Sequence, residues 1–496
     1  MKQNFKAMGK GTNLISELST FFEKSENNRA IDCILGMMKG IRISEKSIGL
    51  SKMYNCKMSS WQVLCLLLVF PFFCVKNALQ YETSTLGRLF RCKKDMFYDF
   101  MNSDLVDWRK ILDMVNRQLL RIVADEESNR QQHETPAKKD RRLRCLVADD
   151  TDLPKTGKAM EFIGKIHSHV SHKNILGFKC LTLMFTDGKS QTFLDASLHG
   201  EEGNAPGKKQ GLTAKEQARR FSKEHTGEAA KSRVEDYWKK KTDKLQEMVR
   251  RAIKNGIRFD YLLVDSWFTN TPLVKFILSR HIGCHLLGMV KMGNTLYHTE
   301  FGDLPAKQII NRLKKEGRVK KSSLLHCVYC YIDATLGGKP VRLFFCKRGR
   351  KGDWNGLLTT DQSLDFLTAY RTYQMRWAVE VGYHECKGLL GLGKCQSRNF
   401  NAQIAAMTIT FIQYNILSIV KRYHSYETIG ELFNCAVGGA VEFSVTEKIW
   451  EVLLKAIFAV ADKLSIYAPD VLKAIIDEDE DMVRLMNLNV KLREAA

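Results

Sequence analysis

Two acidic residues end apolar segments that are typical of buried strands. Asp150 ends the run CLVADD, where it follows Asp149, and Asp265 ends the run YLLVD. The carboxyl ends of neighbouring strands open onto one crevice of a sheet, so both carboxylates are expected there. Side chains alternate between the two faces of a strand, and the sequence does not show which of the two neighbouring aspartates faces the crevice. Asp149 is therefore the alternative to Asp150.

A helical pattern that begins near Ser363 supplies a third carboxylate. At 100° per residue, four of its side chains share one arc of about 60°: Tyr373, Arg376, Glu380 and Lys387. Glu385 falls outside this arc, so Glu380 is the carboxylate expected to face the strand ends. His384 falls near Glu380, where it could orient a ligand or simply lie in solvent. A surface helix with ordinary ion pairs is the alternative interpretation.

Three carboxylates that converge from two strand ends and a helix would repel one another unless cations bind between them. Their oxygen ligands suit Mg²⁺ or Mn²⁺, and two such ions about 3.5 to 4 Å apart can activate a water or a 3′-hydroxyl in phosphodiester displacement. Arg376 and Lys387 would then bind phosphates. The pattern therefore predicts Asp265, Glu380 and either Asp150 or Asp149 as catalytic metal ligands.

The composition favours a polyanionic partner. The chain has 496 residues and a formal net charge of +22, so a polyanionic partner, such as double-stranded DNA, is the first hypothesis. With 44% hydrophobic residues, it is too apolar to be a mainly disordered basic tail. Its 14 cysteines are irregularly spaced and follow no signal segment, so we expect a reducing cytoplasm. The most apolar run, residues 61–75, is too short to span a membrane and predicts a buried helix.

The pattern along the chain predicts a mixed α/β protein. Two strand-like runs around the turn Asp187-Gly188 complete a three-stranded meander with the strand of Asp150. The predicted parts are a helical DNA-end-binding domain at 1–140, the first part of a catalytic core at 141–285, a basic β-rich insertion at 286–356, the second part of the core at 357–426, and a helical region at 427–496 that holds dimer contacts or packs on the core.

The predicted insertion places basic residues next to an aromatic one. The basic run contains Lys347, Arg348, Arg350 and Lys351, and Trp354 follows it. The basic side chains could bind DNA phosphates, and the tryptophan could stack on a flipped base at a sharply bent DNA end. The alternative is that Trp354 packs on the sheet, because tryptophan is usually largely buried.

Two further clusters have the residue types of metal sites. His167, His169 and His172 lack a cysteine or carboxylate to complete a site, so a structural or DNA-facing loop is preferred. Cys327 and Cys330 form the one CxxC pair, but their neighbours are apolar, so packing within a strand is preferred over zinc binding.

Four residues carry a resemblance to the Y-R-E-K signature of the insertion-sequence-four family of DDE transposases: Tyr373, Arg376, Glu380 and Lys387. The segments VADDTDLPKTGK and LLVDSWF resemble that family's first and second acidic motifs, so the likeness covers about residues 140–420. It implies an RNase H-like fold in which Asp150, Asp265 and Glu380 hold two metal ions, with a β-rich insertion before the glutamate.

The resemblance also implies an activity. A transposase of a bacterial insertion sequence would bind its terminal inverted repeats, cut them through hairpinned ends and join the 3′ ends to target DNA, as at least a dimer. Related transposases place an inserted tryptophan on a flipped base, and Trp354 stands at a similar place. The alternatives are an inactive DNA-binding relative, disfavoured by the intact carboxylates, and a nuclease without strand transfer, disfavoured by the helical residues 1–140.

Overall fold

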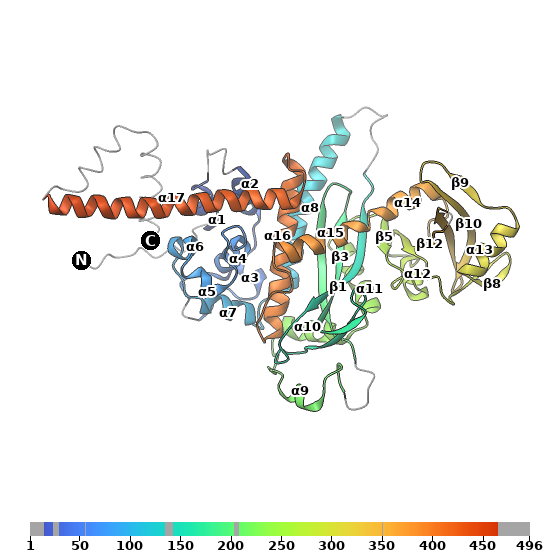
Figure 1. Ribbon diagram of the computed structural model, residues 1–496, viewed down its shortest axis with the longest axis horizontal. Coiled ribbons are helices and arrows are strands. Elements are labelled where there is room, and N and C mark those ends of the chain that lie inside the picture. The colour runs from blue at the N-terminus through green and yellow to red at the C-terminus, as the bar shows by residue number, and fades with distance from the viewer. Residues whose placement is uncertain are drawn as a thin grey trace. The chain divides into compact units, whose positions relative to one another are not determined.

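The computed structural model describes residues 14–22, 29–54, 56–133, 142–202, 208–349 and 351–464. The chain forms two compact units, which are described separately (Figure 1). Unit 1 consists of Met1–Val115, Gly227–Ala230 and Asn401–Ala496, and unit 2 consists of Asn116–Thr226 and Lys231–Phe400. The N-terminal and C-terminal segments thus share one unit, whereas the sequence predicts two separate parts at the ends of the chain.

Unit 1 is helical where it is described. Its helices are α1 (Leu14–Ser19), α2 (Arg29–Gly40), α3 (Glu45–Ile48), α4 (Ser60–Val69), α5 (Ala78–Tyr81), α6 (Thr85–Leu89), α7 (Asp95–Asn102), the start of α8 (Trp108–His133), α16 (Phe400–Tyr423) and α17 (Ile429–Lys463). The run predicted as a buried helix becomes α4, with Ser59 and Gln62 as a capping box at its start. Gln413 of α16 donates to the carbonyls of Leu67 and Leu68, which joins the N-terminal and C-terminal segments.

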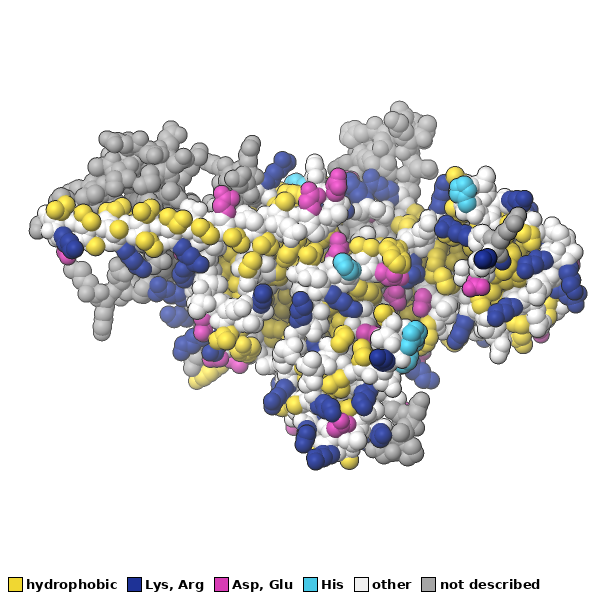
Figure 2. Space-filling model, viewed as in Figure 1, with side chains coloured by type: hydrophobic (Ala, Val, Ile, Leu, Met, Phe, Trp, Pro, Cys, Tyr) yellow, Lys and Arg dark blue, Asp and Glu magenta, His cyan; other side chains and the backbone are white. Residues whose placement is uncertain are grey.

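Two helices of unit 1 have unusual apolar surfaces. By length and composition α16 could cross a membrane, but 94% of its apolar window is buried, as in the core helix of a globular unit. Figure 2 shows a row of hydrophobic side chains along α17. Its exposed members are Val441, Val445, Ile449, Val452, Leu453 and Val460.

Unit 2 is built on one mixed sheet of 12 strands in the described residues. The strands are β1 (Cys145–Pro154), β2 (Gly164–Ser168), β3 (Lys173–Thr186), β4 (Gln191–His199), β5 (Tyr261–Val264), β6 (His285–Met289), β7 (Leu296–Thr299), β8 (Gly302–Pro305), β9 (Lys320–Ser322), β10 (Cys327–Leu336), β11 (Lys339–Arg348) and β12 (Trp354–Thr359). The helices of this unit, besides the end of α8, are α9 (Ala214–Ala218), α10 (Glu228–Trp238), α11 (Lys241–Lys254), α12 (Thr271–Ile277), α13 (Ala306–Lys315), α14 (Phe366–Gln374) and α15 (Trp377–Gly388).

The first half of the sheet has the strand order of an RNase H-like core. Strand β3 lies antiparallel between β1 and β4, and the turn between β3 and β4 contains Gly188 with φ +79°, a value that glycine adopts without strain. Strands β5 and β6 then continue the sheet parallel to β1. The predicted meander and the predicted mixed α/β, RNase H-like fold are therefore confirmed. The short strand β2, which pairs with the far end of β3, was not predicted.

The predicted β-rich insertion continues the core sheet instead of forming a separate body. Its last strand, β12, pairs antiparallel with β6, and β11, β10, β7 and β8 follow outward in that order. The predicted boundary at residue 286 therefore cuts through β6, a core strand. Within the insertion, residues 327–348 form the hairpin of β10 and β11.

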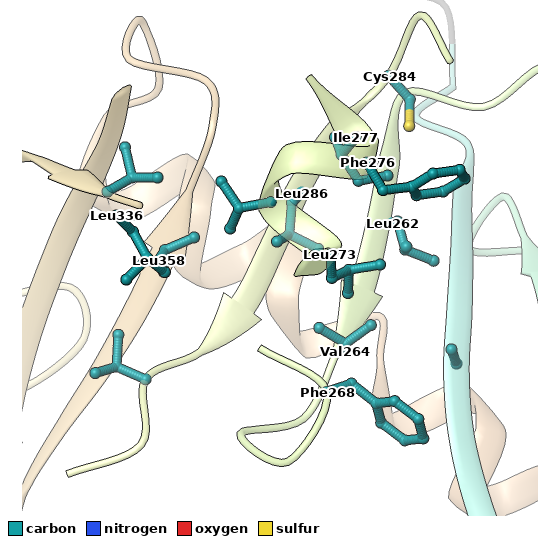
Figure 3. Packing of buried hydrophobic residues seen from close by; sticks show 14 of the residues in the cluster. Leu262, Val264, Phe268, Leu273, Phe276, Ile277, Cys284, Leu286, Leu336 and Leu358 are labelled. Atoms are coloured by element: carbon teal, nitrogen blue, oxygen red, sulfur yellow. The ribbon is translucent and has the colours of Figure 1, made fainter. Parts of the chain in front are cut away.

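Helices α11 and α12 bury one face of this sheet. Leu146 and Ala148 of β1 belong to the same buried cluster as Leu245 and Met248 of α11. Figure 3 shows the side chains of α12 lying over β5 and β6, with Leu273 beside Leu262 and Leu286. Burial of these apolar surfaces stabilises the sheet whose strand ends carry the acidic residues.

Candidate active site

Asp149 and Asp150 lie in the same strand but on opposite faces of the sheet. Strand β1 pairs with β3 in unbroken register, so its side chains alternate through both aspartates. Ala148 belongs to the buried cluster on the α11 face, and Asp150 follows it to that side, where its carboxylate pairs with Lys241 of α11. Asp149 points to the other face, where its Oδ2 accepts a hydrogen bond of 3.1 Å from Arg376.

Asp265 directly follows β5, beside the middle of β1, which continues past both aspartates to Pro154. These two strands run parallel and in register, so the residues after their last pair, Asp149 and Asp265, are neighbours at one edge of the sheet. The Asp265 Oδ1 atom accepts from the backbone N–H groups of Trp267 and Phe268, both at 3.1 Å. This turn fixes the direction of the carboxylate.

Glu380 lies on a helix that differs from the predicted one. The single helix expected from Ser363 to Lys387 is divided into α14 and α15, and α14 begins only after Asp365, which caps it. At the junction the backbone bonds are of the i to i+3 type, as from Arg376 N to the Tyr373 carbonyl at 3.0 Å. The prediction of one continuous helix was therefore wrong, because a tighter turn interrupts it.

Despite this break, the four signature residues gather at the carboxylate edge of β1 and β5. Arg376 donates both to Asp149 and to Glu380, one turn further along. Tyr373 donates to the carbonyl of Val264 at 3.1 Å, and Lys387 donates to Thr151 Oγ1 at 2.7 Å. The guanidinium that the sequence assigns to phosphate binding is thus engaged by two carboxylates.

Burial, and to a lesser extent neighbouring negative charge, raises the pKa values of Asp149 and Asp265. Burial, then the charge of Asp265, raises the pKa of Asp149 to about 7, against the opposing effect of Arg376. Burial also raises the pKa of Asp265, with a further contribution from the charge of Asp150. Both shifts arise first from burial, and the charge of a neighbouring carboxylate adds to each of them.

The donor set fits a divalent cation. In the described residues, no group of three or more His, Cys, Asp or Glu side chains lies close enough to hold a metal ion as it stands. The guanidinium of Arg376 instead bridges Asp149 and Glu380. Carboxylate oxygens that repel one another and attract a cation between them are the ligands that Mg²⁺ and Mn²⁺ prefer. Asp152, in contrast, is already neutralised by Lys179 at 2.6 Å.

Trp354 and the basic run of the insertion lie apart from these carboxylates in the fold, on β11, β12 and the loop between them. Trp354 is half-buried and packs against the core cluster, with the Lys314 ammonium 5.0 Å from its ring centroid. This environment favours the packing alternative over stacking on a base. Lys347 is half-buried, Arg348 and Lys351 are exposed, and Arg350 lies outside the described residues.

The histidine and cysteine clusters lie in different parts of unit 2. His167, His169 and His172 are exposed along the hairpin of β2 and β3. Cys327 and Cys330 are buried in β10 as free thiols, and burial raises the pKa of Cys330 to about 11. His384 is exposed on α15.

Lys241 is the residue at this site that the sequence analysis missed. It is the first residue of α11 and ends a run of three lysines, residues 239–241, directly after Trp238. Its ammonium pairs with Asp150 and lies 4.3 Å from the ring centroid of Trp267. The signal that could have indicated it was this basic run at a helix start, where positive charge is unfavourable and calls for a nearby anion.

Two protein-family models match the chain over these elements. A family described as "DDE superfamily endonuclease" matches residues 85–312, and one described as "Transposase DDE domain" matches residues 239–416. No curated protein gives a significant match. Among solved structures, the chain is similar to that in the "Cryo-EM structure of piggyBac transposase synaptic complex with hairpin DNA", with 14% identity, a TM-score of 0.42, and coverage of 87% of this chain and 80% of that chain. The two family matches together span both aspartate strands and the glutamate helix, so the chain carries a domain of the DDE superfamily of transposases and endonucleases.

Proposed function

We propose that this protein is a DNA transposase of the insertion-sequence-four family. It would bind the terminal inverted repeats of its own element, cut them by metal-assisted hydrolysis through hairpinned ends, and join the 3′ ends to target DNA. The observation that carries the proposal is the meeting of Asp149, Asp265 and Glu380 around Arg376, at the point where β5 ends beside β1. The DDE family matches over the same strands and helix support it.

Asp149, rather than Asp150, is the first carboxylate of the proposed set. It shares a sheet face with Glu380, whereas Asp150 is occupied by Lys241 on the opposite face. Asp149, Asp265 and Glu380 would hold two Mg²⁺ or Mn²⁺ ions. When bound, such ions supply Lewis acidity to the scissile phosphate and lower the pKa of an attacking water or 3′-hydroxyl.

The chain's own residues perform the remaining tasks. Arg376 neutralises Asp149 and Glu380 before substrate arrives, and Tyr373 ties the end of α14 to the end of β5 through the Val264 carbonyl. Lys387, whose ammonium lies beside Thr151, is placed to contact a phosphate that approaches β1. The exposed cations of the insertion, Arg348 among them, extend this DNA-binding surface.

Two further properties belong to the proposal. The protein would act as a homodimer on DNA, so that both ends of an element are cut and joined together, and the exposed apolar row of α17 is the surface we assign to the dimer. It would work in the bacterial cytoplasm on the nucleoid, which agrees with 14 cysteines in the free thiol form.

The test is incubation of the purified protein and Mg²⁺ with DNA that flanks its own reading frame. Asp149→Asn, Asp265→Asn and Glu380→Gln should each reduce cleavage and joining by at least about 100-fold, because each removes a charged ligand oxygen, while DNA binding survives. The matched control is Asp150→Asn, a neighbour in the same strand, which should keep metal-dependent cleavage.

The outcomes separate the alternatives. Loss of cleavage in Asp150→Asn, with cleavage retained in Asp149→Asn, would return the first ligand to Asp150. Cleavage without joining by the parent protein would make it a nuclease, and DNA binding without either reaction would make it an inactive relative.

A further inference from the structure

Tyr383 places a hydroxyl group in the interior of unit 2, between helix α15 and the sheet. It follows Glu380 by three residues on α15, so the two side chains are neighbours on one side of that helix. Tyr383 is 6% exposed, and its ring stacks on Phe193 of β4 with the ring centroids 5.9 Å apart. A hydroxyl buried in this way needs hydrogen-bond partners within the protein.

The Tyr383 hydroxyl joins α15 to two strands of the core. It donates to the backbone carbonyl of Asp149 on β1 at 2.9 Å, and it also bonds to the hydroxyl of Thr182 on β3. A carbonyl can only accept, and the Tyr383 hydroxyl has one proton, so Thr182 is the donor in the second bond. The result is a directed chain of hydrogen bonds from Thr182 through Tyr383 to the backbone at Asp149.

The register of the sheet places both partners of Tyr383 on the α15 face. Asp149 and Thr182 are direct partners in the ladder of β1 and β3, and side chains of paired residues point to the same face. Leu181 and Leu183, on either side of Thr182, belong to the buried cluster on the α11 face. Thr182 and Asp149 therefore face α15, which agrees with the bond between Asp149 and Arg376.

Helix α15 thus contacts Asp149 at two points. Arg376, at the start of the helix, binds the carboxylate, and Tyr383 binds the backbone carbonyl. Glu380 lies between these two contacts along the chain. Gly382 allows the close approach, because a Cβ there would lie 2.7 Å from a side-chain atom of β3. Two contacts from one helix to one residue fix where the Glu380 carboxylate lies relative to that of Asp149.

We propose that Tyr383 is a positioning residue for the metal site. Its hydroxyl fixes the backbone of β1 at Asp149 relative to α15, so that the carboxylates of Asp149 and Glu380 lie at the separation that a shared divalent ion requires. This inference rests on the proposed transposase function, in which these carboxylates are metal ligands. Tyr383 itself binds neither metal nor DNA. Loss of its hydroxyl should therefore weaken metal binding and leave DNA affinity unchanged.

The experiment measures Mn²⁺ binding by the purified full-length protein without DNA, from the electron paramagnetic resonance signal of free Mn²⁺. Asp149→Asn defines the part of the binding that belongs to the site. Tyr383→Phe keeps the ring and removes only the hydroxyl. It should bind Mn²⁺ at this site about three- to tenfold more weakly, the change expected when one hydrogen bond behind a metal ligand is lost.

A cleavage assay at increasing Mg²⁺ gives a second measurement. Tyr383→Phe should need about three- to tenfold more Mg²⁺ for half of its maximal rate, and its rate at saturating Mg²⁺ should approach that of the parent protein. A partly unfolded variant would instead show a lower maximal rate at the parent's Mg²⁺ requirement. That result would overturn the positioning role.

The matched control is Tyr237→Phe. Tyr237 is also buried, and its hydroxyl donates to the backbone carbonyl of Phe162 at 2.6 Å and accepts from Gln210, so no carboxylate is among these partners. Tyr237→Phe should lose about as much thermal stability as Tyr383→Phe and should bind Mn²⁺ as the parent does.

Thr182 provides a graded pair of variants. Thr182→Ser keeps a hydroxyl that can donate to Tyr383 and should bind Mn²⁺ like the parent protein. Thr182→Val removes that donor but leaves the bond from Tyr383 to Asp149, so its Mn²⁺ affinity should lie between those of the parent and Tyr383→Phe.

The two proposals can fail separately. Equal Mn²⁺ affinity in Tyr383→Phe and the parent would overturn the positioning role and leave the transposase proposal in place. An equal weakening in Tyr237→Phe would assign the effect to general stability and would also overturn it. If the parent bound no more Mn²⁺ than Asp149→Asn and cleaved no DNA, the proposed function would fall and this inference with it.

Discussion

Mild acid should destabilise unit 2 through His199. This side chain is buried at the end of β4, where its Nδ1–H donates to the Lys239 carbonyl at 3.2 Å and its Nε2 accepts from Ser197 at 2.7 Å. Both bonds suit the neutral ring, and protonation would remove the acceptor at Nε2. Burial, then the charge of Lys241, lowers the pKa of His199 to about 4, from an ordinary value of 6.5.

The sign and size of the effect follow from proton linkage. Below pH 6.5 the unfolded chain binds a proton at His199, whereas the folded protein binds this proton only near pH 4. The free energy of unfolding therefore falls as the pH falls through that window. Between pH 7.5 and pH 5, these two pKa values give a loss of about 2 kcal/mol in the free energy of unfolding. The full loss, reached below pH 4, is about 3 kcal/mol.

Urea unfolding of the parent protein and of His199→Gln at both pH values measures this contribution. Carboxylates titrate in both proteins, so the difference between them isolates the histidine. His199→Gln should be less stable at pH 7.5 but should lose about 2 kcal/mol less on acidification. Equal pH dependence in the two proteins would refute the assignment of a neutral, buried ring.

Three further results are expected. Gly382→Ala should lower both stability, by about 1 to 2 kcal/mol in urea unfolding, and cleavage, because a Cβ there would lie 2.7 Å from Met184 Cε and push α15 and Glu380 off the sheet; an equally active variant would show that α15 has room to move. Arg348→Ala should reduce the slope of log affinity for DNA against log salt by about 0.9, and an unchanged slope would place it off the DNA. Deletion of residues 427–496 should leave binding of one DNA end but remove paired-end complexes in gel shifts, whereas paired complexes in a soluble truncation would move the dimer contact elsewhere.

The features that could be predicted from the sequence are those that depend on a local pattern of residues or on the family signature. Apolar runs that end in acids became the neighbouring parallel strands β1 and β5, although β1 continues past both aspartates to Pro154. The spacing around Arg376 and Glu380 brought both side chains to these acids. The sequence could not choose between Asp149 and Asp150, because that choice depends on which face of β1 the helices α11 and α15 cover. This is a property of packing between segments about a hundred or more residues apart.

Other errors have similarly non-local causes. No glycine or proline marks the break between α14 and α15 in the sequence. Met375 and Arg376 at the junction also keep helical backbone angles, so the helical periodicity alone does not reveal the break. The insertion was predicted as a separate part because its strands are local hairpins. Only the pairing of β12 with β6 shows that it extends the core sheet.

The pairing of β6 with β12 has a consequence for how this insertion can vary. The chain leaves the core after Met289 and returns to it at Leu357, two residues that face each other across one ladder. An intervening segment that starts and ends at paired residues can lengthen at little entropic cost, since closure entropy grows only with the logarithm of length. Its complete removal would be costly for another reason: β12 would become a bare edge strand, open to pairing with other chains. The insertion thus protects the core from aggregation as well as presenting its own cationic surface.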